Sequence, residues 1–183
     1  DCVEKIPTSR WDVDALDGTD AELYVKHGHF IHGIELFDNA FFGVSAAEAR
    51  VMDPNQRILL ETAYDALNRS GQGRDELVGL RAGVYVGLAG SDWASAFIDR
   101  QQQQGKAGSV GAYYLGLDPS ALAGRISYVL GLTGPSLVVS TACSSSLVAL
   151  DAAVQHVRSG VCPVSLVAGV NLMLHHGAFV ALC

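Results

Sequence analysis

The sequence predicts an α/β fold with a covered sheet. Short apolar runs without charged residues, at 84–88, 137–139 and 164–170, have the character of buried strands. Helical patterns at residues 120–130 and 144–158 separate the later runs. Strands that alternate with helices are typical of a sheet whose faces are covered by those helices.

Local sequence signals mark where the first helices of the chain begin and end. Residues 1–40 are mixed and polar, with few periodic segments. A capping box over residues 45–48 begins a short helix. Asp53 followed by Pro54 caps a longer helix, which Gly71 ends. The buried face of that longer helix is predicted to carry Ile58, Leu59, Ala63, Ala66 and Leu67.

The later part of the chain holds a predicted loop and two further helices. Residues 99–112 include four consecutive glutamines and several glycines, which predict a polar surface loop. The helix at 120–130 ends at Gly131, and the helix at 144–158 ends before Gly160. The 144–158 helix is amphipathic, and the apolar side chains that share one face are Leu147, Leu150, Val154 and Val157.

Composition excludes several classes of protein. The chain has 183 residues, enough for one domain or part of a larger one, and 49% of them are hydrophobic. A net charge of −7 and the lack of Lys or Arg runs argue against a nucleic-acid partner. The most apolar region, residues 126–150, is interrupted by glycines and Pro135, so no membrane span is expected.

The four cysteines (Cys2, Cys143, Cys162 and Cys183) have wide, unpatterned spacing. Without a CxxC pair, neither a zinc site nor a disulfide scaffold is indicated. Free thiols and the lack of a signal peptide indicate the cytoplasm, or an organelle if a targeting segment precedes the chain. His27, His29 and His32 with Glu35 match no strong metal-ligand spacing, so we expect a solvated loop there and no metal site.

The most informative segment, residues 134–147, places Cys143 between the end of a strand and the first turn of a helix. Unpaired backbone N–H groups and the helix dipole favour a thiolate at such a position. The same N–H groups can hold the oxyanion that forms when a thiolate attacks a thioester carbonyl. Cys143 is therefore a candidate nucleophile, with backbone N–H as oxyanion donor.

Two other interpretations of this elbow stay open from the residues alone. A cysteine at an apolar strand end is often an inert buried residue. A hydrolase nucleophile also lies at a strand–turn–helix corner, within the pattern G-x-(S/C)-x-G. That pattern requires glycine where this chain has Thr141 and Ser145, so the sequence disfavours a hydrolase.

Residues 140–147 (STACSSSL) resemble the active-site segment of β-ketoacyl synthases, especially the ketosynthase domains of modular type I polyketide synthases. Residues 123–132 (AGRISYVLGL) resemble the helix that precedes it. Residues 52–61 (MDPNQRILLE), 37–45 (FDNAFFGVS) and 169–174 (GVNLML) resemble further family blocks. Because the blocks occur in family order along nearly the whole chain, it is identified as a member of this family, within the thiolase-like superfamily.

The resemblance implies a thiolase-like layered αβαβα architecture. Residues 1–183 would supply its amino-terminal half as a partial ketosynthase domain, truncated at both ends. Family members pair the cysteine with two later histidines, in HGTGT-like and N-x-G-H-like motifs, and none of the six histidines here has such surroundings. Ser140 stands where the family usually has Asp, close to its subunit contact, and Asn55 stands where it usually has Gln.

The resemblance also implies the chemistry of a 3-oxoacyl synthase, an acyltransferase. Cys143 would accept an acyl group from the phosphopantetheine arm of an acyl carrier protein. A malonyl-type extender would then be decarboxylated and attack that thioester, giving a β-ketoacyl product in polyketide or fatty acid biosynthesis. A homodimer without a bound cofactor is implied, and the 183-residue chain alone should be inactive. The alternative is a ketosynthase-like domain that binds acyl chains or scaffolds a dimer without elongating them.

Overall fold

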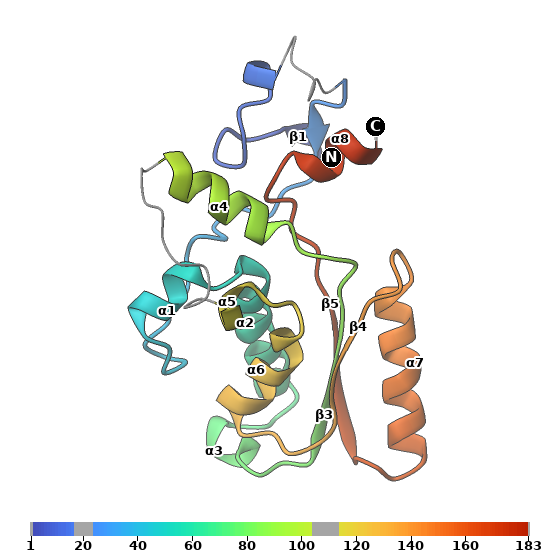
Figure 1. Cartoon of the computed structure of the whole chain (residues 1–183). Coiled ribbons are helices and arrows are strands. Elements are labelled where there is room, and N and C mark those ends of the chain that lie inside the picture. Colours follow the sequence, from blue (N-terminus) through green and yellow to red (C-terminus); the bar gives the residue numbers. More distant parts are fainter. Residues whose placement is uncertain (1, 17–23, 104–113, 183) are drawn as a thin grey trace. The chain divides into compact units, whose positions relative to one another are not determined.

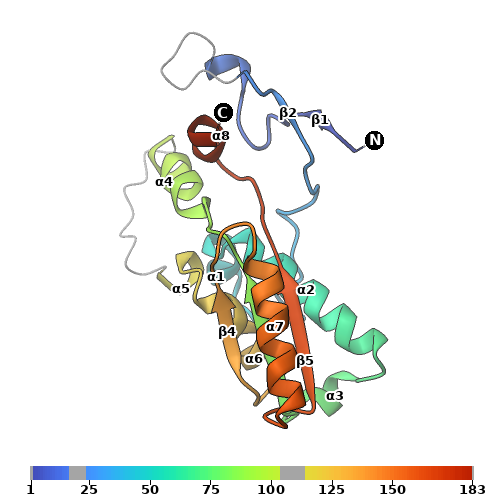
Figure 2. The same ribbon diagram turned by 90° about the vertical axis from the view of Figure 1, so that its right-hand side faces the viewer.

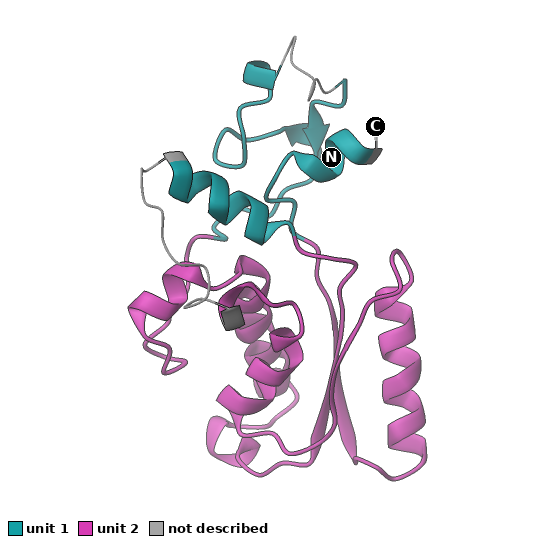
Figure 3. Cartoon of the chain, viewed as in Figure 1, with its two compact units in different colours: residues 1–34, 92–109, 172–183 teal, residues 35–91, 110–171 magenta. Residues whose placement is uncertain are grey.

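A computed structural model describes residues 2–16, 24–103 and 114–182. The chain divides into two compact units (Figure 3). Unit 1 consists of residues 1–34, 92–109 and 172–183. Unit 2 consists of residues 35–91 and 110–171, and therefore contains both the predicted strands and Cys143.

Unit 2 is built on a three-stranded parallel sheet with the order β4-β3-β5. The central strand β3 (Ala82–Gly87) pairs with β4 (Ser136–Val139) on one side and β5 (Val164–Gly169) on the other. All six residues of β3 are buried, as expected for a central strand whose two faces are both covered. The predicted α/β class and the predicted strands are confirmed.

Helices cover both faces of this sheet (Figure 1, Figure 2). Helix α7 (Ser145–Arg158) lies on one face, and α6 (Ala121–Leu130) lies on the other beside α2 (Pro54–Arg69). Parallel strands need such crossover connections, and α7 is the one between β4 and β5. The shorter helices of unit 2 are α1 (Ala46–Val51), α3 (Arg74–Leu77) and α5 (Tyr114–Leu117).

Alternate residues of β3 serve the two faces, because successive side chains of a strand point to opposite sides. Tyr85 packs against Ala149 and Ala153 of α7. Gly83 and Gly87 share the Tyr85 side of the strand. The β3 residues that join the main core, on the side of α2 and α6, are Ala82, Val84 and Val86.

The predicted helix ends are confirmed where the sequence contains a capping residue, although only the Ser45 half of the predicted capping box forms, since the Glu48 carboxylate accepts from Arg125. Ser45 Oγ accepts the Glu48 N–H at 3.1 Å, and Asp53 Oδ1 accepts the Asn55 N–H at 2.7 Å. Gly131 ends α6 with a φ of 70°, the left-handed conformation that glycine adopts without strain.

The buried face of α2 was predicted only in part. Leu59, Ala63 and Leu67 are buried, as predicted, whereas Ile58 is only half-buried. Leu60 is also fully buried, whereas Ala66 is exposed, so its predicted burial is wrong. The buried stripe is rotated toward Leu60, which leaves Ala66 at its solvent edge.

The predicted loop at residues 99–112 is wrong over its first part. Helix α4 (Trp93–Gln103) continues to residue 103, and residues 104–112 lie outside the described residues. The cause is twofold: glutamine is a good helix former, and the buried Trp93, Ala96 and Phe97 give this helix an apolar face.

Unit 1 has a small core of its own. An antiparallel pair, β1 (Glu4–Lys5) and β2 (His27–Gly28), is accompanied by the 3₁₀ helix η1 (Asp14–Leu16) and by α8 (Gly177–Leu182). The buried apolar residues of this core are Ile6, Trp11, Val13 and Phe30. None of the helices among the described residues has the length and apolar content needed to cross a bilayer.

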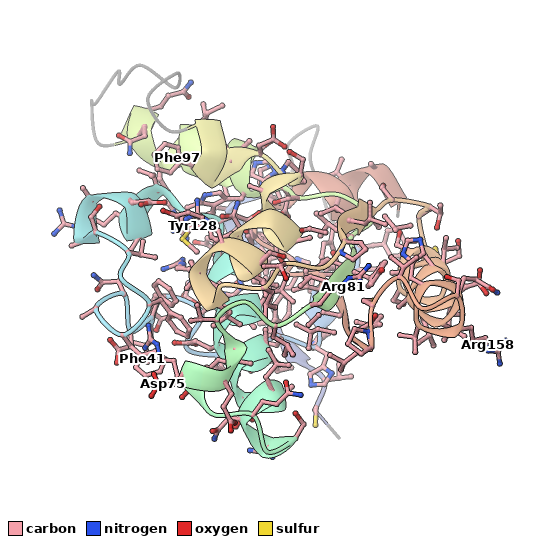
Figure 4. All side chains as sticks on the ribbon, turned by 90° about the horizontal axis from the view of Figure 1, so that it is seen from below. Phe41, Asp75, Arg81, Phe97, Tyr128 and Arg158 are labelled. Carbon is pink, nitrogen blue, oxygen red and sulfur yellow. The ribbon has the colours of Figure 1, made fainter. Side chains whose placement is uncertain are left out.

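Helix α7 buries a different face from its apolar stripe. Ser145, Ala149 and Ala153 face inward, whereas Leu147 is 69% exposed and Leu150 45% exposed. Part of the stripe lines a groove of about 310 Å³. Arg158 also lines it, and Figure 4 shows this residue projecting outward from the last turn of α7. The other residues that line the groove are Leu150, Ala153, Val154, Val157, Ser165 and Val167.

Candidate active site

Cys143 lies in the short connection between β4 and α7, where the sequence predicted an elbow. β4 ends at Val139 and α7 begins at Ser145, with Ser144 as the N-cap residue. Cys143 therefore directly precedes the N-cap of a fourteen-residue helix. Cys143 is exposed, which argues against its interpretation as an inert buried cysteine.

The backbone reverses sharply just before Cys143. Ala142 has a φ of 54°, and it is the one non-glycine residue with positive φ in the described part of the chain. A left-handed conformation costs a residue with a Cβ about 1 kcal/mol, so surrounding contacts have to hold it.

Two serine hydroxyls supply such contacts. Ser145 Oγ accepts the Thr141 N–H at 2.9 Å and donates to the Ala142 carbonyl at 2.6 Å. Ser144 Oγ donates to the Thr141 carbonyl at 2.7 Å, and lies 2.9 Å from Thr141 Oγ1. Ser145 is buried, whereas Ser144 is exposed. The elbow is thus closed by side chains of the residues that follow the cysteine.

Two glycines at strand ends allow the first turn of α7 to lie directly on the sheet. A Cβ on Gly87 would be 2.5 Å from the Ser146 nitrogen, and a Cβ on Gly169 would be 3.0 Å from Ser146 Cβ. This close approach of α7 was not predicted from the sequence. The available signal was a glycine as the next-to-last residue of each of two predicted strands.

Among the described residues, the histidines are exposed or are paired with side chains other than Cys143. His156 Nδ1 lies 2.6 Å from the Tyr85 hydroxyl, His175 Nε2 lies 3.0 Å from Asp99 Oδ2, and His32 Nε2 lies 2.9 Å from Glu4 Oε1. His27 and His29 are exposed. No group of three or more ligand side chains that could hold a metal ion occurs among the described residues.

A buried polar cluster under α7 was missed by sequence reasoning. Tyr85 is fully buried, and burial together with the neighbouring Cys162 raises the pKa of its phenol. Cys162 is buried as well, with its sulfur 3.2 Å from Ser165 Oγ. In unit 1, burial and the adjacent His175 lower the pKa of His176. Among the described residues, neither Tyr85 nor Cys162 is hydrogen-bonded to Cys143.

The first residues of the family block at 52–61 are buried and form hydrogen bonds to other elements of unit 2. Asp53, Asn55 and Gln56 are each 1% exposed. Ser91 Oγ donates to Asp53 Oδ2 at 2.6 Å, and Arg125 Nε donates to Gln56 Oε1 at 2.7 Å. The block therefore joins the start of α2 to the segment after β3 and to α6.

The two departures from the family pattern have different surroundings. Asn55 fits the buried cap, because its amide donates to Asp53 Oδ1 at 2.9 Å. Ser140 is exposed, and its hydroxyl makes no hydrogen bond to another described residue.

Comparison with known proteins places these features in one family. Residues 1–183 match the model of the β-ketoacyl synthase, N-terminal domain. Polyketide synthase GfsB of Streptomyces halstedii is 44% identical over 185 residues, which cover 98% of this chain and 3% of that protein. The spectinabilin polyketide synthase system protein NorC of Streptomyces orinoci is 39% identical, over 98% of this chain and 8% of that protein.

Solved structures agree with the fold. The oxazolomycin ketosynthase domain of Streptomyces albus superimposes with a TM-score of 0.85 at 33% identity, over 100% of this chain and 32% of that one. The module 6 ketosynthase of the bacillaene synthase of Bacillus subtilis gives 0.81 at 32% identity, over 99% and 29%. The chain thus spans about a third of the solved ketosynthase chains and a small part of the curated relatives.

Proposed function

The chain belongs to the β-ketoacyl synthase family, and from this premise we propose that Cys143 is the acyl-accepting nucleophile of a polyketide ketosynthase. The observation that carries the proposal is the exposed Cys143 at the strand–helix elbow, within the segment that resembles the family's active-site block. A hydrolase lacks support, because the corner has Thr141 and Ser145 in place of its glycines.

The proposed first step is transfer of an acyl group to Cys143. The thiolate attacks the thioester carbonyl of an acyl chain carried on phosphopantetheine, and the carbonyl oxygen becomes an oxyanion that accepts the backbone N–H of Cys143. Collapse of this tetrahedral intermediate expels the phosphopantetheine thiolate, which takes up a proton. The acyl chain is then held as a thioester on Cys143.

The proposed second step forms the carbon–carbon bond. A malonyl-type extender loses CO₂, and the electron pair left on its α-carbon attacks the acyl carbonyl of the Cys143 thioester. The Cys143 thiolate leaves, and the β-ketoacyl product remains on the carrier. Histidines from outside residues 1–183 would promote the decarboxylation, so the 183-residue chain by itself should not condense substrates.

The proposed partners are an acyl carrier protein and a second copy of the complete domain. In the described chain β4 pairs only with β3, so its other edge is bare, and Leu137 on it is 42% exposed. An unpaired apolar edge strand is a surface for pairing with another chain. This supports a homodimer contact along β4, beside Ser140.

We also propose that the remainder of the complete domain covers the apolar stripe of α7. Leu147, Leu150 and Val157 are each at least 40% exposed, and a contiguous exposed apolar stripe is unfavourable in water. In an αβαβα arrangement α7 would lie in the central helix layer and would bury this stripe.

The alternative is a domain that binds acyl chains without elongating them. It is motivated by the lack of HGTGT-like and N-x-G-H-like motifs in residues 1–183. Intact HGTGT-like and N-x-G-H-like motifs in the complete coding sequence would contradict this alternative.

Acyl transfer to Cys143 is tested with the full-length protein and a synthetic acyl thioester. Mass spectrometry of the digested protein should show the acyl mass on the peptide that contains Cys143, and Cys143→Ala should abolish it. Cys162→Ala is the matched control, because Cys162 is buried and should not be acylated. Acylation that persists in Cys143→Ala would end the assignment.

A further inference from the structure

Ser145 lies two residues after Cys143, yet its hydroxyl contacts the backbone before the cysteine. Oγ accepts the Thr141 N–H at 2.9 Å and donates to the Ala142 carbonyl at 2.6 Å. Ser145 is 4% exposed, so water does not readily compete for these bonds. Both hydrogen bonds span the turn that contains Cys143 and join its two sides.

The Ala142 carbonyl belongs to the same peptide unit as the Cys143 N–H. A trans peptide is planar, so its C=O and the following N–H point in opposite directions along one plane. A hydrogen bond that fixes the direction of the Ala142 carbonyl therefore also fixes the direction of the Cys143 N–H. This N–H is the proposed oxyanion donor.

Backbone geometry at this peptide needs an external restraint. The φ of 54° at Ala142 is unfavourable for a residue with a Cβ, so the turn tends to relax unless contacts oppose rotation. The Ala142 carbonyl accepts the Ser145 Oγ–H at 2.6 Å and the Ser145 N–H at 3.1 Å. The shorter of these bonds comes from the side chain.

We propose that Ser145 is a positioning residue, which orients the backbone N–H of Cys143 toward the developing oxyanion through the Ala142–Cys143 peptide. This inference rests on the proposed acyl transfer to Cys143. It assigns to Ser145 an effect on the transition state rather than on the thiol itself, since the hydroxyl forms no hydrogen bond with the described Cys143 sulfur.

Ser144 provides the matched control. Its Oγ donates to the Thr141 carbonyl at 2.7 Å, so Ser144→Ala also removes a local hydrogen bond of the elbow. That bond does not involve the Ala142–Cys143 peptide. A general loss of order in the elbow should affect both variants alike, whereas a loss of N–H orientation should affect Ser145→Ala alone.

The experiment compares two reactions of the same thiol in full-length protein. Acyl transfer from a synthetic acyl thioester passes through an oxyanion, whereas alkylation by iodoacetamide displaces iodide and forms none. Ser145→Ala should lower kcat/KM for acylation roughly tenfold and change the alkylation rate less than about threefold. The loss is smaller than the ~10²–10³-fold that follows removal of an oxyanion donor, because the Ser145 N–H still restrains the carbonyl.

The outcomes separate the inference from the function on which it rests. A tenfold loss in Ser145→Ala, with Ser144→Ala within about threefold of wild type and alkylation retained, supports the inference. Equal acylation by wild type and Ser145→Ala overturns it, as does a parallel loss of acylation and alkylation or a Ser145→Ala protein without folded structure. Failure of the wild-type protein to acylate Cys143 would instead refute the proposed function.

Discussion

Replacement of Gly87 by alanine should displace the first turn of α7 from the sheet. A Cβ at this position would lie 2.5 Å from the Ser146 nitrogen, 2.6 Å from Ser146 Cα and 2.7 Å from the Ser145 carbonyl carbon. Ordinary contacts begin at 3.4 Å, so the Cβ is about 0.9 Å too close to the nearest atom. All of these are backbone atoms, so rotation of a side chain cannot relieve the overlap.

The displacement should reduce both stability and acyl transfer. Insertion of a methyl group into a packed interior costs about 1–3 kcal/mol, and a rigid backbone neighbour places Gly87→Ala toward the upper end. A shift of about 1 Å in a reacting group can cost about 10²-fold in rate. We therefore expect a loss of about 2–3 kcal/mol in the free energy of unfolding, and about 10²-fold in acylation of Cys143.

Gly124→Ala is the matched control for this test. Gly124 lies inside α6, and no atom lies within 4 Å of the position that a Cβ would take there, so alanine should fit and raise stability by about 0.5–1 kcal/mol. Urea unfolding and the rate of Cys143 acylation are measured for both variants in the full-length protein. Wild-type stability and acylation in Gly87→Ala would refute the close contact between β3 and α7.

Two further changes test the surroundings of α7. Tyr85→Phe removes the 2.6 Å hydrogen bond to His156 and should cost about 1 kcal/mol in urea unfolding. Because burial raises the pKa of Tyr85 above 10.0, the unfolded chain loses this proton first, so stability should fall as pH rises above about 10, and less steeply in Tyr85→Phe. Leu150→Ser should destabilise the full-length protein by about 2 kcal/mol or more if the remainder of the domain covers this stripe. A change within about 0.5 kcal/mol, as for an ordinary surface residue, would contradict that proposal.

Elements with local signals could be predicted from the sequence, whereas their solvent exposure often could not. Asp53 and Gly131 mark helix ends through contacts within a few residues, so the bounds of α2 and α6 followed from the sequence. The polar glutamines of α4 suggested a loop, because the apolar signal of Trp93 and Phe97 lies at the other end of that helix. Exposure of Leu147 depends on which segments pack against α7, which no local pattern specifies.

The position of Cys143 could be predicted from the sequence, but the contacts that hold the elbow in place could not. A strand followed by a helix predicts an elbow, and the resemblance of residues 140–147 to the family's active-site segment makes Cys143 the candidate nucleophile. The elbow is restrained by Ser145. It is also supported by Gly87, which is 56 positions before Cys143 in the sequence but lies against the first turn of α7. Such a contact is fixed by the parallel register of β3 and by the crossover through α7.

The alternation along β3 explains why the support under the elbow is a glycine. One side of the strand must fill the main core, and Val84 and Val86 do so with branched side chains. The other side must let α7 approach, and Tyr85 can be accommodated there because its ring lies over Gly83, whose Cβ would be 2.5 Å from Tyr85 Cε2. At Gly87 no such space remains, because the backbone of α7 itself occupies it. The strand therefore sets the distance between α7 and the sheet, and Ser145 sets the orientation of the Ala142–Cys143 peptide.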